Sequence, residues 1–183
     1  MIRVPLKGNA VSIRPIVRKD AEYMRQIRNC PKNNKYLSNR EKKISLNEQL
    51  NWMNNHYLSP DSIDFIIEIN KNLRSVGCIA IYDIANGTAE LGRYIAENPL
   101  GALEGELLAL KYAFEKLNIE KIYCKTVIKN IKVWEQHLKL GFFKEGEDFD
   151  SRIQEKRVLQ YLTKEMYLSW DYSKYEKIIL NFS

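Results

Sequence analysis

The dipeptide Asn86-Gly87 constrains the fold of this chain more than any other feature of its sequence. It separates two runs that are rich in β-branched, aromatic and small apolar residues, 76–84 and 89–97. Asn-Gly is the preferred centre of a type I′ turn, which needs positive φ at both central residues, so the two runs are expected to form a β-hairpin. A third run of this kind, residues 63–69, comes before them, and a short Asn-Lys-Asn turn separates it from the run at 76–84. The middle of the chain therefore predicts a three-stranded antiparallel meander.

Helical patterns lie on both sides of this meander. Before it, a strand over 11–16 is followed by a helix over 19–29 and by a second helix that begins at a capping box of Ser45 and Glu48. The elements expected after it are a helix following Gly101, a strand over 122–128, a helix over 131–140 that ends at Gly141, and strands over 142–149 and 157–166. This order predicts a mixed α+β sheet and not an alternating Rossmann arrangement.

Length and charge limit the class of protein. The 183 residues suffice for one domain with a sizeable core. Lys and Arg number 29 against 23 Asp and Glu, which gives a net charge of +6. This surplus of positive charge favours anionic partners such as nucleic acid, membrane headgroups or phosphorylated small molecules. Because the charge is spread along the chain, it does not distinguish between these partners.

The cysteines and histidines argue against a disulfide framework or a metal site. Cys30, Cys78 and Cys124 are well separated and form no C-x-x-C pair, and His56 and His137 are the only histidines. The N-terminal residues lack the apolar core of a signal peptide, and no run approaches the roughly 20 apolar residues that span a bilayer. We therefore expect a cytoplasmic protein without a metal or a membrane partner.

One segment, residues 91–106, combines a strand, a loop with glycines and the start of a helix. Its glycines, Gly101 and Gly105, would let the backbone approach a ligand closely. The free N–H groups in the first turn of a helix, together with the helix dipole, suit a diphosphate. The segment is thus a candidate anion cradle, although the same glycine spacing also occurs in plain turns.

Three stretches further along the chain carry a resemblance to a known family. They read YAFEKLNIEKI at 112–122, VIKN at 127–130 and LKLGFFKEG at 138–146. In this order they resemble the second half of a GNAT-superfamily acetyltransferase, and the order of elements up to about Met166 fits that family too. The resemblance implies the GNAT acyl-CoA N-acyltransferase fold, with a mostly antiparallel sheet of six to seven strands flanked by helices. It also implies a GNAT domain over residues 1–166. The remaining residues, 167–183, are rich in aromatic side chains and are expected to form a helical extension.

The same resemblance implies acetyl-CoA as the cosubstrate. It would lie in a splay between the strands over 89–97 and 122–128, with its pantetheine arm along the backbone of the first strand and its diphosphate over the helix N–H groups. Asn130 matches the family Asn that contacts the cofactor arm, and it could also cap a helix. The cofactor-binding residues implied in this way are Ile95, Ala96, Gly101, Ala102, Leu103, Glu104, Gly105, Glu106 and Asn130.

The sequence departs from the family pattern in two places. The usual loop pattern is Gln/Arg-x-x-Gly-x-Gly/Ala, whereas here Leu100 stands first and Leu103 stands at the middle glycine. Some diphosphate contacts should therefore differ. The family Tyr that commonly protonates the leaving CoA thiolate is replaced by His137.

Acetyl transfer to an amine needs an unprotonated nitrogen, a stabilised oxyanion and a proton for the departing sulfur. An imidazolium can donate that proton, because its ordinary pKa of ~6.5 is closer to that of a thiol than the pKa of a phenol is. We therefore expect His137 to be the general acid and Glu90, beside the splay, to be the base, with backbone N–H groups near Ile95 polarising the carbonyl. A packing role for His137 and an exposed strand position for Glu90 remain open.

The acceptor amine is expected beside the first two predicted helices. Residues 27–31 and 44–52 are similar to stretches of amino-sugar N-acetyltransferases that act on UDP-linked amino sugars in pseudaminic-acid-type biosynthesis. A nucleotide sugar needs a cation for its diphosphate and an aromatic or apolar platform for its base and sugar. The substrate-binding candidates are Arg28, Asn29 and Trp52, with Arg25, Arg40 and Tyr57 as further possibilities. The resemblance thus favours direct acetylation of a UDP-4-amino-4,6-dideoxy-sugar.

Other functions stay open at this stage. Related stretches occur in ribosomal-protein N-terminal acetyltransferases and in polyamine acetyltransferases, although the surplus positive charge would repel polyamines. The two departures from the family pattern also suit a non-catalytic acyl-CoA-binding module. No basic stripe with interleaved aromatic residues indicates nucleic-acid binding. The tail after Met166 carries too many apolar residues for a free linker, so it should pack on its own domain or across a homodimer.

Overall fold

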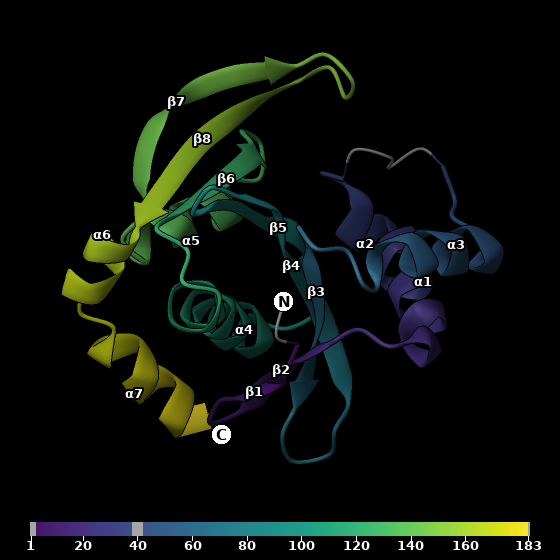
Figure 1. The fold of residues 1–183 in the computed structure, drawn as a ribbon, viewed down its shortest axis with the longest axis horizontal. Coiled ribbons are helices and arrows are strands. Elements are labelled where there is room, and N and C mark those ends of the chain that lie inside the picture. Colours follow the sequence, from purple (N-terminus) through teal and green to yellow (C-terminus); the bar gives the residue numbers. More distant parts are fainter. Residues whose placement is uncertain (1–2, 38–41, 183) are drawn as a thin grey trace.

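One mixed sheet runs through the protein and carries helices on both faces (Figure 1). The computed structural model describes residues 3–37 and 42–182. Within these residues eight strands pair in the order β1-β2-β3-β4-β5-β6-β8-β7, and every neighbouring pair is antiparallel except β5 with β6. The strands are β1 (Leu6–Lys7), β2 (Val11–Pro15), β3 (Ile63–Ile69), β4 (Ser75–Ala85), β5 (Thr88–Ala96), β6 (Lys121–Val127), β7 (Phe143–Asp150) and β8 (Glu155–Thr163).

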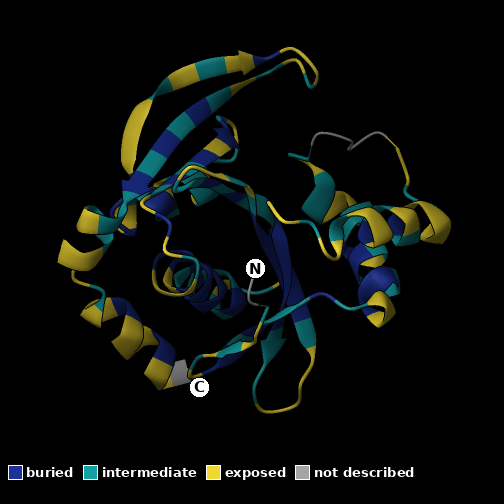
Figure 2. Cartoon of the chain, viewed as in Figure 1, coloured by how far each residue is buried: buried dark blue, intermediate teal, exposed yellow. Residues whose placement is uncertain are grey.

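The helices form two layers around the sheet. One layer holds α1, α2 and α3, and the opposite face carries α4, which is buried along most of its length, with α7 against it (Figures 1 and 2). α5 packs against β8 in the other half of the sheet. The helices are η1 (Arg18–Asp20), α1 (Ala21–Asn29), α2 (Pro31–Asn34), α3 (Leu46–His56), α4 (Pro99–Lys111), η2 (Tyr112–Lys116, a π-helical turn), α5 (Ile131–Lys139), α6 (Lys164–Ser169) and α7 (Ser173–Phe182).

The alternation of side chains along β3 separates two hydrophobic cores. Phe65 and Ile67 belong to the core beneath α4, whereas Ile66 belongs to the core beneath α1 and α3. Because successive strand residues face opposite sides, Asp64 lies on the same face as Ile66. A buried acidic side chain is thereby placed on the α1 side of the sheet.

The local signals of the sequence are confirmed. Asn86 and Gly87 have φ values of +50° and +76°, as a type I′ turn requires. The reciprocal capping box of Ser45 and Glu48 begins α3, and Gly141 ends α5 with a φ of +93°. These are positions where one or two residues determine the backbone.

Three expectations about the elements need correction. The sheet has eight strands among the described residues instead of six to seven, because the two residues of β1 are too few to give an alternating pattern. The last strand ends at Thr163 instead of Met166, since the Thr163 side chain accepts a hydrogen bond from the Met166 amide and caps α6. Pro31 ends α1 as expected, but it also begins the short helix α2.

The C-terminal extension packs on its own domain. Tyr175 and Ile179 of α7 are buried in the core beneath α4. The indole N–H of Trp170 and the hydroxyl of Tyr175 both donate to the carbonyl of Lys139, and the hydroxyl of Tyr172 donates to the carbonyl of Leu140. The last carbonyls of a helix lack partners within the helix, so these side chains satisfy the end of α5.

We predict that Tyr175→Phe lowers the free energy of unfolding by about 1 kcal/mol, because the Lys139 carbonyl loses its shorter hydrogen bond, 2.6 Å from oxygen to oxygen. For a chain of this length the melting temperature should fall by roughly 2–4 °C. Tyr57→Phe is the matched control, since Tyr57 is exposed and its hydroxyl forms no hydrogen bond within residues 3–37 and 42–182. Equal melting temperatures for the two variants would contradict the role given to the extension.

Candidate functional site

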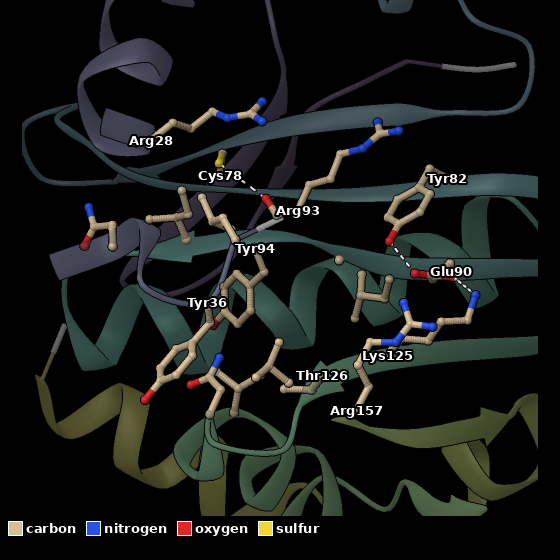
Figure 3. Close-up of a pocket in the computed structure, with 18 of the residues that line it drawn as sticks. Arg28, Tyr36, Cys78, Tyr82, Glu90, Arg93, Tyr94, Lys125, Thr126 and Arg157 are labelled. Atoms are coloured by element: carbon tan, nitrogen blue, oxygen red, sulfur yellow. Dashed lines mark hydrogen bonds and ion pairs between the residues drawn. The ribbon is translucent and has the colours of Figure 1, made fainter. Parts of the chain in front are cut away.

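A cavity of about 300 Å³ opens where the two halves of the sheet diverge. β5 and β6 provide one wall, α5 lies at one end, and α1, α2 and α3 lie at the other. Further residues come from the tip of the β7–β8 hairpin and from β8, among them Arg157 (Figure 3). The cavity therefore collects side chains from both halves of the sheet.

The diverging strands form the splay that was expected. β5 and β6 pair over three positions only, which join Thr88, Ala89 and Glu90 to residues 121–123. Beyond Glu90, β5 stays paired with β4 and β6 stays paired with β8, but the two strands no longer pair with each other. One edge of β5, including Ile95 and Ala96, is thus left without a neighbouring strand.

A β-bulge lies on this open part of β5. Ala80 pairs with Gly92 and Cys78 pairs with Ile95, so β5 has one more residue than β4 over this interval. Arg93 has a φ of +47°, a left-handed conformation that is uncommon outside glycine. Neither Arg93 nor Tyr94 is paired with β4 or β6. Bulges re-aim backbone groups and often lie next to active sites, and this one faces the cavity.

α4 begins earlier than expected, at Pro99. Asn98 is favoured at the N-cap and Pro99 at the first helical position. The Asn98 side chain accepts a hydrogen bond from the Gly101 amide, and its carbonyl accepts one from the Ala102 amide. The amides of residues 103–106 lie inside the helix and donate to its preceding turn. The expectation that the amides of residues 101–106 are free for a diphosphate is therefore corrected, and Leu100 carries the first-turn amide for which the described residues offer no partner.

The two glycines of α4 serve close packing of the helix on the sheet. A Cβ atom at Gly105 would lie 2.7 Å from Cδ1 of Ile67, and one at Gly101 would lie 3.1 Å from Cγ2 of Val76. Both contacts are tighter than ordinary van der Waals distances. The spacing that suggested an anion cradle thus reflects helix–sheet contact, and α4 contributes no residue to the wall of the cavity.

The acidic side chains of α4 point into the protein. The Glu104 carboxylate accepts hydrogen bonds from the amides of Asn9, Ala10 and Val11 at 2.5, 2.9 and 2.7 Å, which fastens the β1–β2 turn to α4. Glu106 is completely buried and faces α5, where it accepts a hydrogen bond from the Gln136 side chain. Burial raises the pKa of Glu106, and the neighbouring His137 opposes this effect.

His137 lies in the wall of the cavity but is almost completely buried. Its Nδ1 is 2.9 Å from Oε1 of Gln160, and the Gln160 amide group donates to the carbonyl of Trp134, so Nδ1 carries the hydrogen. Its Nε2 is 3.2 Å from Oε1 of Glu106, within ion-pair distance but without hydrogen-bond geometry. A proton on Nε2 is therefore not directed at that carboxylate.

Asn130 and Glu90 both line the cavity: Glu90 lies on β5, and Asn130 lies between the end of β6 and α5. Asn130 stands at the N-cap of α5, yet its side chain makes no capping hydrogen bond and can face a ligand. The Glu90 carboxylate accepts hydrogen bonds from the Tyr82 hydroxyl and the Lys125 ammonium group (Figure 3). Glu90 is thus a held carboxylate at the point where the strands separate.

The acceptor-binding candidates divide into two groups. Arg28 and Trp52 contribute to the cavity, whereas Asn29 does not, because both polar atoms of its side chain bond to the backbone of Ile44. Arg25 forms an ion pair with Glu22 away from the cavity. Arg40 lies outside the described residues, and Tyr57 is exposed and does not line the cavity.

Sequence reasoning missed several side chains that the fold brings into the cavity. They are Tyr36, Asp64, Tyr82, Arg93, Arg152 and Arg157. Asp64 and Arg93 are isolated charges within apolar strands, a signal that could have marked them. Arg157 bonds to Asp148 and Asp150 within the β7–β8 hairpin, and no local pattern shows that this hairpin reaches the cavity.

Comparison with known families and structures agrees with this geometry. Residues 11–143 match the acetyltransferase (GNAT) domain. The chain belongs to the GNAT acetyltransferase family. The GNAT fold explains the mixed sheet with its splay, and the protein is an acetyltransferase of this type. A comparison with curated proteins gave no match.

Several solved structures share the fold. The structure of apo FdhC, described as a nucleotide-linked sugar GNAT, has a TM-score of 0.81 and 25% sequence identity over 97% of this chain and 99% of that chain. Spermidine N-acetyltransferase from Vibrio cholerae, solved with CoA and spermine, has a TM-score of 0.76 and 22% identity over 88% of this chain and 100% of that one. A GNAT-family acetyltransferase from Bacillus anthracis has a TM-score of 0.76 and 19% identity, with 88% and 99% coverage. The last two likenesses concern the fold alone.

The described part of the GNAT domain holds no group of three or more His, Cys, Asp or Glu side chains placed to bind a metal ion. Across residues 3–37 and 42–182, no helix combines the length and the apolar character needed to cross a membrane.

We predict that Gly77→Ala impairs both stability and CoA binding. A Cβ atom there would lie 2.3 Å from the carbonyl oxygen of Ile95 and 3.1 Å from Cα of Ala96, so β5 would have to move. Such overpacking costs about 1–3 kcal/mol. Gly146→Ala is the matched control, because nothing lies within 4 Å of its Cβ position. Calorimetric titration with CoA should show weaker binding for Gly77→Ala only, and unchanged affinity would contradict a cofactor site along β5.

Proposed function

We propose that the protein transfers the acetyl group of acetyl-CoA to the primary amine of a nucleotide-linked amino sugar by direct attack of the amine. The observation that carries this proposal is the cavity at the splay, which joins an unpaired strand edge to a cluster of cationic and aromatic side chains. The likeness to a nucleotide-linked sugar GNAT at 25% identity supports the acceptor class. The stretches at 27–31 and 44–52 support a UDP-4-amino-4,6-dideoxy-sugar.

The residues present fit an acyl-CoA arm. The open edge of β5 at Ile95 and Ala96 offers backbone groups that no strand occupies, and Asn130 offers an uncommitted side-chain amide. At the start of α4, the Asn98 side chain and the Leu100 amide would bind the diphosphate, instead of the backbone amides of residues 101–106. The bulge at Arg93 would present backbone N–H groups to the carbonyl oxygen of the acetyl group.

The base role falls to Glu90 on β5, and the acid role falls to His137 on α5, the helix that follows β6. Glu90 would take the proton that the amine loses, directly or through a water molecule. His137 would give the Nε2 proton to the departing sulfur, because Gln160 retains the proton on Nδ1 and the contact of Nε2 with Glu106 lacks hydrogen-bond geometry. Glu106 would then act as the buried counter-ion that keeps the imidazole ring in place.

We predict that a panel of amines assayed with acetyl-CoA gives the highest kcat/KM for a UDP-linked amino sugar. Peptides with a free N-terminus and spermidine should react at least tenfold more slowly, because neither carries a diphosphate for the cationic side chains of the cavity. The measurement is the release of free thiol. Preference for a peptide would favour a peptide acetyltransferase, and CoA binding without turnover of any amine would favour a non-catalytic module.

We predict that His137→Phe lowers kcat by about 10²-fold while the KM for acetyl-CoA stays within a factor of two, since loss of a general acid affects the chemical step. The variant also leaves Glu106 buried without a counter-ion, so its melting temperature should fall. Adding Glu106→Gln separates the two effects: stability should recover and kcat should not. Recovery of kcat in the double variant would contradict the acid role and assign His137 to packing.

A further inference from the structure

Two arginines share one indole ring at the α1 side of the cavity. The Cζ atom of Arg28 lies 5.7 Å from the centre of the Trp52 ring, and that of Arg93 lies 5.6 Å from the same centre. Arg93 also lies over the Tyr82 ring at 4.4 Å. Figure 3 shows Arg28 and Arg93 on the same side of the cavity, away from Thr126 and Arg157. We call Arg28, Arg93 and Trp52 the arginine–tryptophan cluster.

The two arginines of the arginine–tryptophan cluster share one neighbouring carboxylate, that of Asp64. Arg93 forms an ion pair with Asp64 at 3.3 Å and a hydrogen bond to the Ser62 hydroxyl. Arg28 has no ion pair or hydrogen bond to any residue in 3–37 or 42–182, although it is half-buried. It differs in this from the other basic side chains of the cavity wall: Lys125 is paired with Glu90, Arg152 with Asp150, and Arg157 with Asp148 and Asp150.

The surroundings of Arg28 disfavour an isolated positive charge. Burial lowers the pKa of Arg28 and the nearby Arg93 lowers it further, whereas the charge of Asp64 opposes both effects. Asp64, whose pKa is raised by burial, is a single carboxylate beside two cations, and its ion pair is with Arg93. A half-buried charge without a partner is costly, and an anionic ligand would remove that cost. The planar guanidinium group matches phosphate oxygens in pairs, and an indole face can hold it in position.

We propose that the arginine–tryptophan cluster binds a phosphate group carried by the acceptor, so that the enzyme selects nucleotide-linked amines over polyamines. The identity of the acceptor rests on the function proposed above, whereas the anion site can be tested without turnover. The phosphates of CoA are the other source of this chemistry. We assign them to the start of α4, which contributes no residue to the cavity.

The test is calorimetric binding of UDP, inorganic pyrophosphate and uridine to the full chain. UDP and pyrophosphate should bind and uridine should bind much more weakly. Arg28→Gln should weaken UDP binding about 10- to 100-fold, the range for loss of a charge-assisted hydrogen-bonded contact, and Arg28→Lys should fall between it and the unaltered chain. Arg25→Gln is the matched control on the same helix, because Arg25 is paired with Glu22 and does not line the cavity. Its UDP affinity should stay within a factor of two.

Several outcomes would overturn the anion site. Equal losses in Arg28→Gln and Arg25→Gln would show a non-specific charge effect, and displacement of UDP by saturating CoA would show that UDP occupies the cofactor site. A melting temperature for Arg28→Gln within 2 °C of that of Arg25→Gln confirms that the comparison concerns folded protein.

If UDP binds through Arg28 and no amino sugar is acetylated, the anion site stands and the proposed function fails. If Arg28→Gln acetylates an amino sugar as well as the unaltered chain does, the function stands and the anion site fails.

Discussion

The short parallel contact between β5 and β6 is the constraint on which the rest of the structure depends. Each strand keeps an antiparallel partner on its other side, β8 for β6 and β4 for β5 apart from the bulge at Arg93, so neither needs the other beyond Glu90. Divergence therefore leaves backbone hydrogen-bonding groups unpaired at the cavity, where a ligand can satisfy them. The bulge at Arg93 lies on this same segment of β5.

Buried contacts fix the positions of α4 and α5, the helices on either side of this opening. α4 approaches the sheet closely because Gly101 and Gly105 have no side chains, and Glu104 fastens it to the N-terminal turn. α5 is held at its end by the carbonyl contacts of Trp170, Tyr172 and Tyr175. The buried pair of Glu106 and His137 joins the two helices across the splay. The C-terminal extension is thus connected to the candidate site through α5, although it lines no part of the cavity.

Local sequence signals predicted most of the fold. The Asn86-Gly87 turn, the capping box at Ser45 and the glycine at 141 each determine a backbone conformation by themselves, so the elements beside them could be placed from the sequence. The sequence predicts the start of α4 too late, because Gly101 favours a loop by propensity, whereas the Asn98 cap and Pro99 begin the helix before it. The cavity was only partly predictable, because Asp64, Arg93 and the hairpin arginines meet through long-range packing that no local pattern encodes. The tight turn glycines and the packing glycines look alike in sequence, and only the contacts of α4 with Ile67 and Val76 distinguish them.

Amide hydrogen exchange of β5 with and without CoA tests the central claim most directly. The account predicts that CoA slows exchange in the segment 91–96, because its arm would supply partners for backbone groups that β6 leaves free. Protection should be weak or absent for residues 88–90, which are already paired with β6. Unchanged exchange over 91–96 at saturating CoA, with protection confined to other segments, would contradict a cofactor site in the splay.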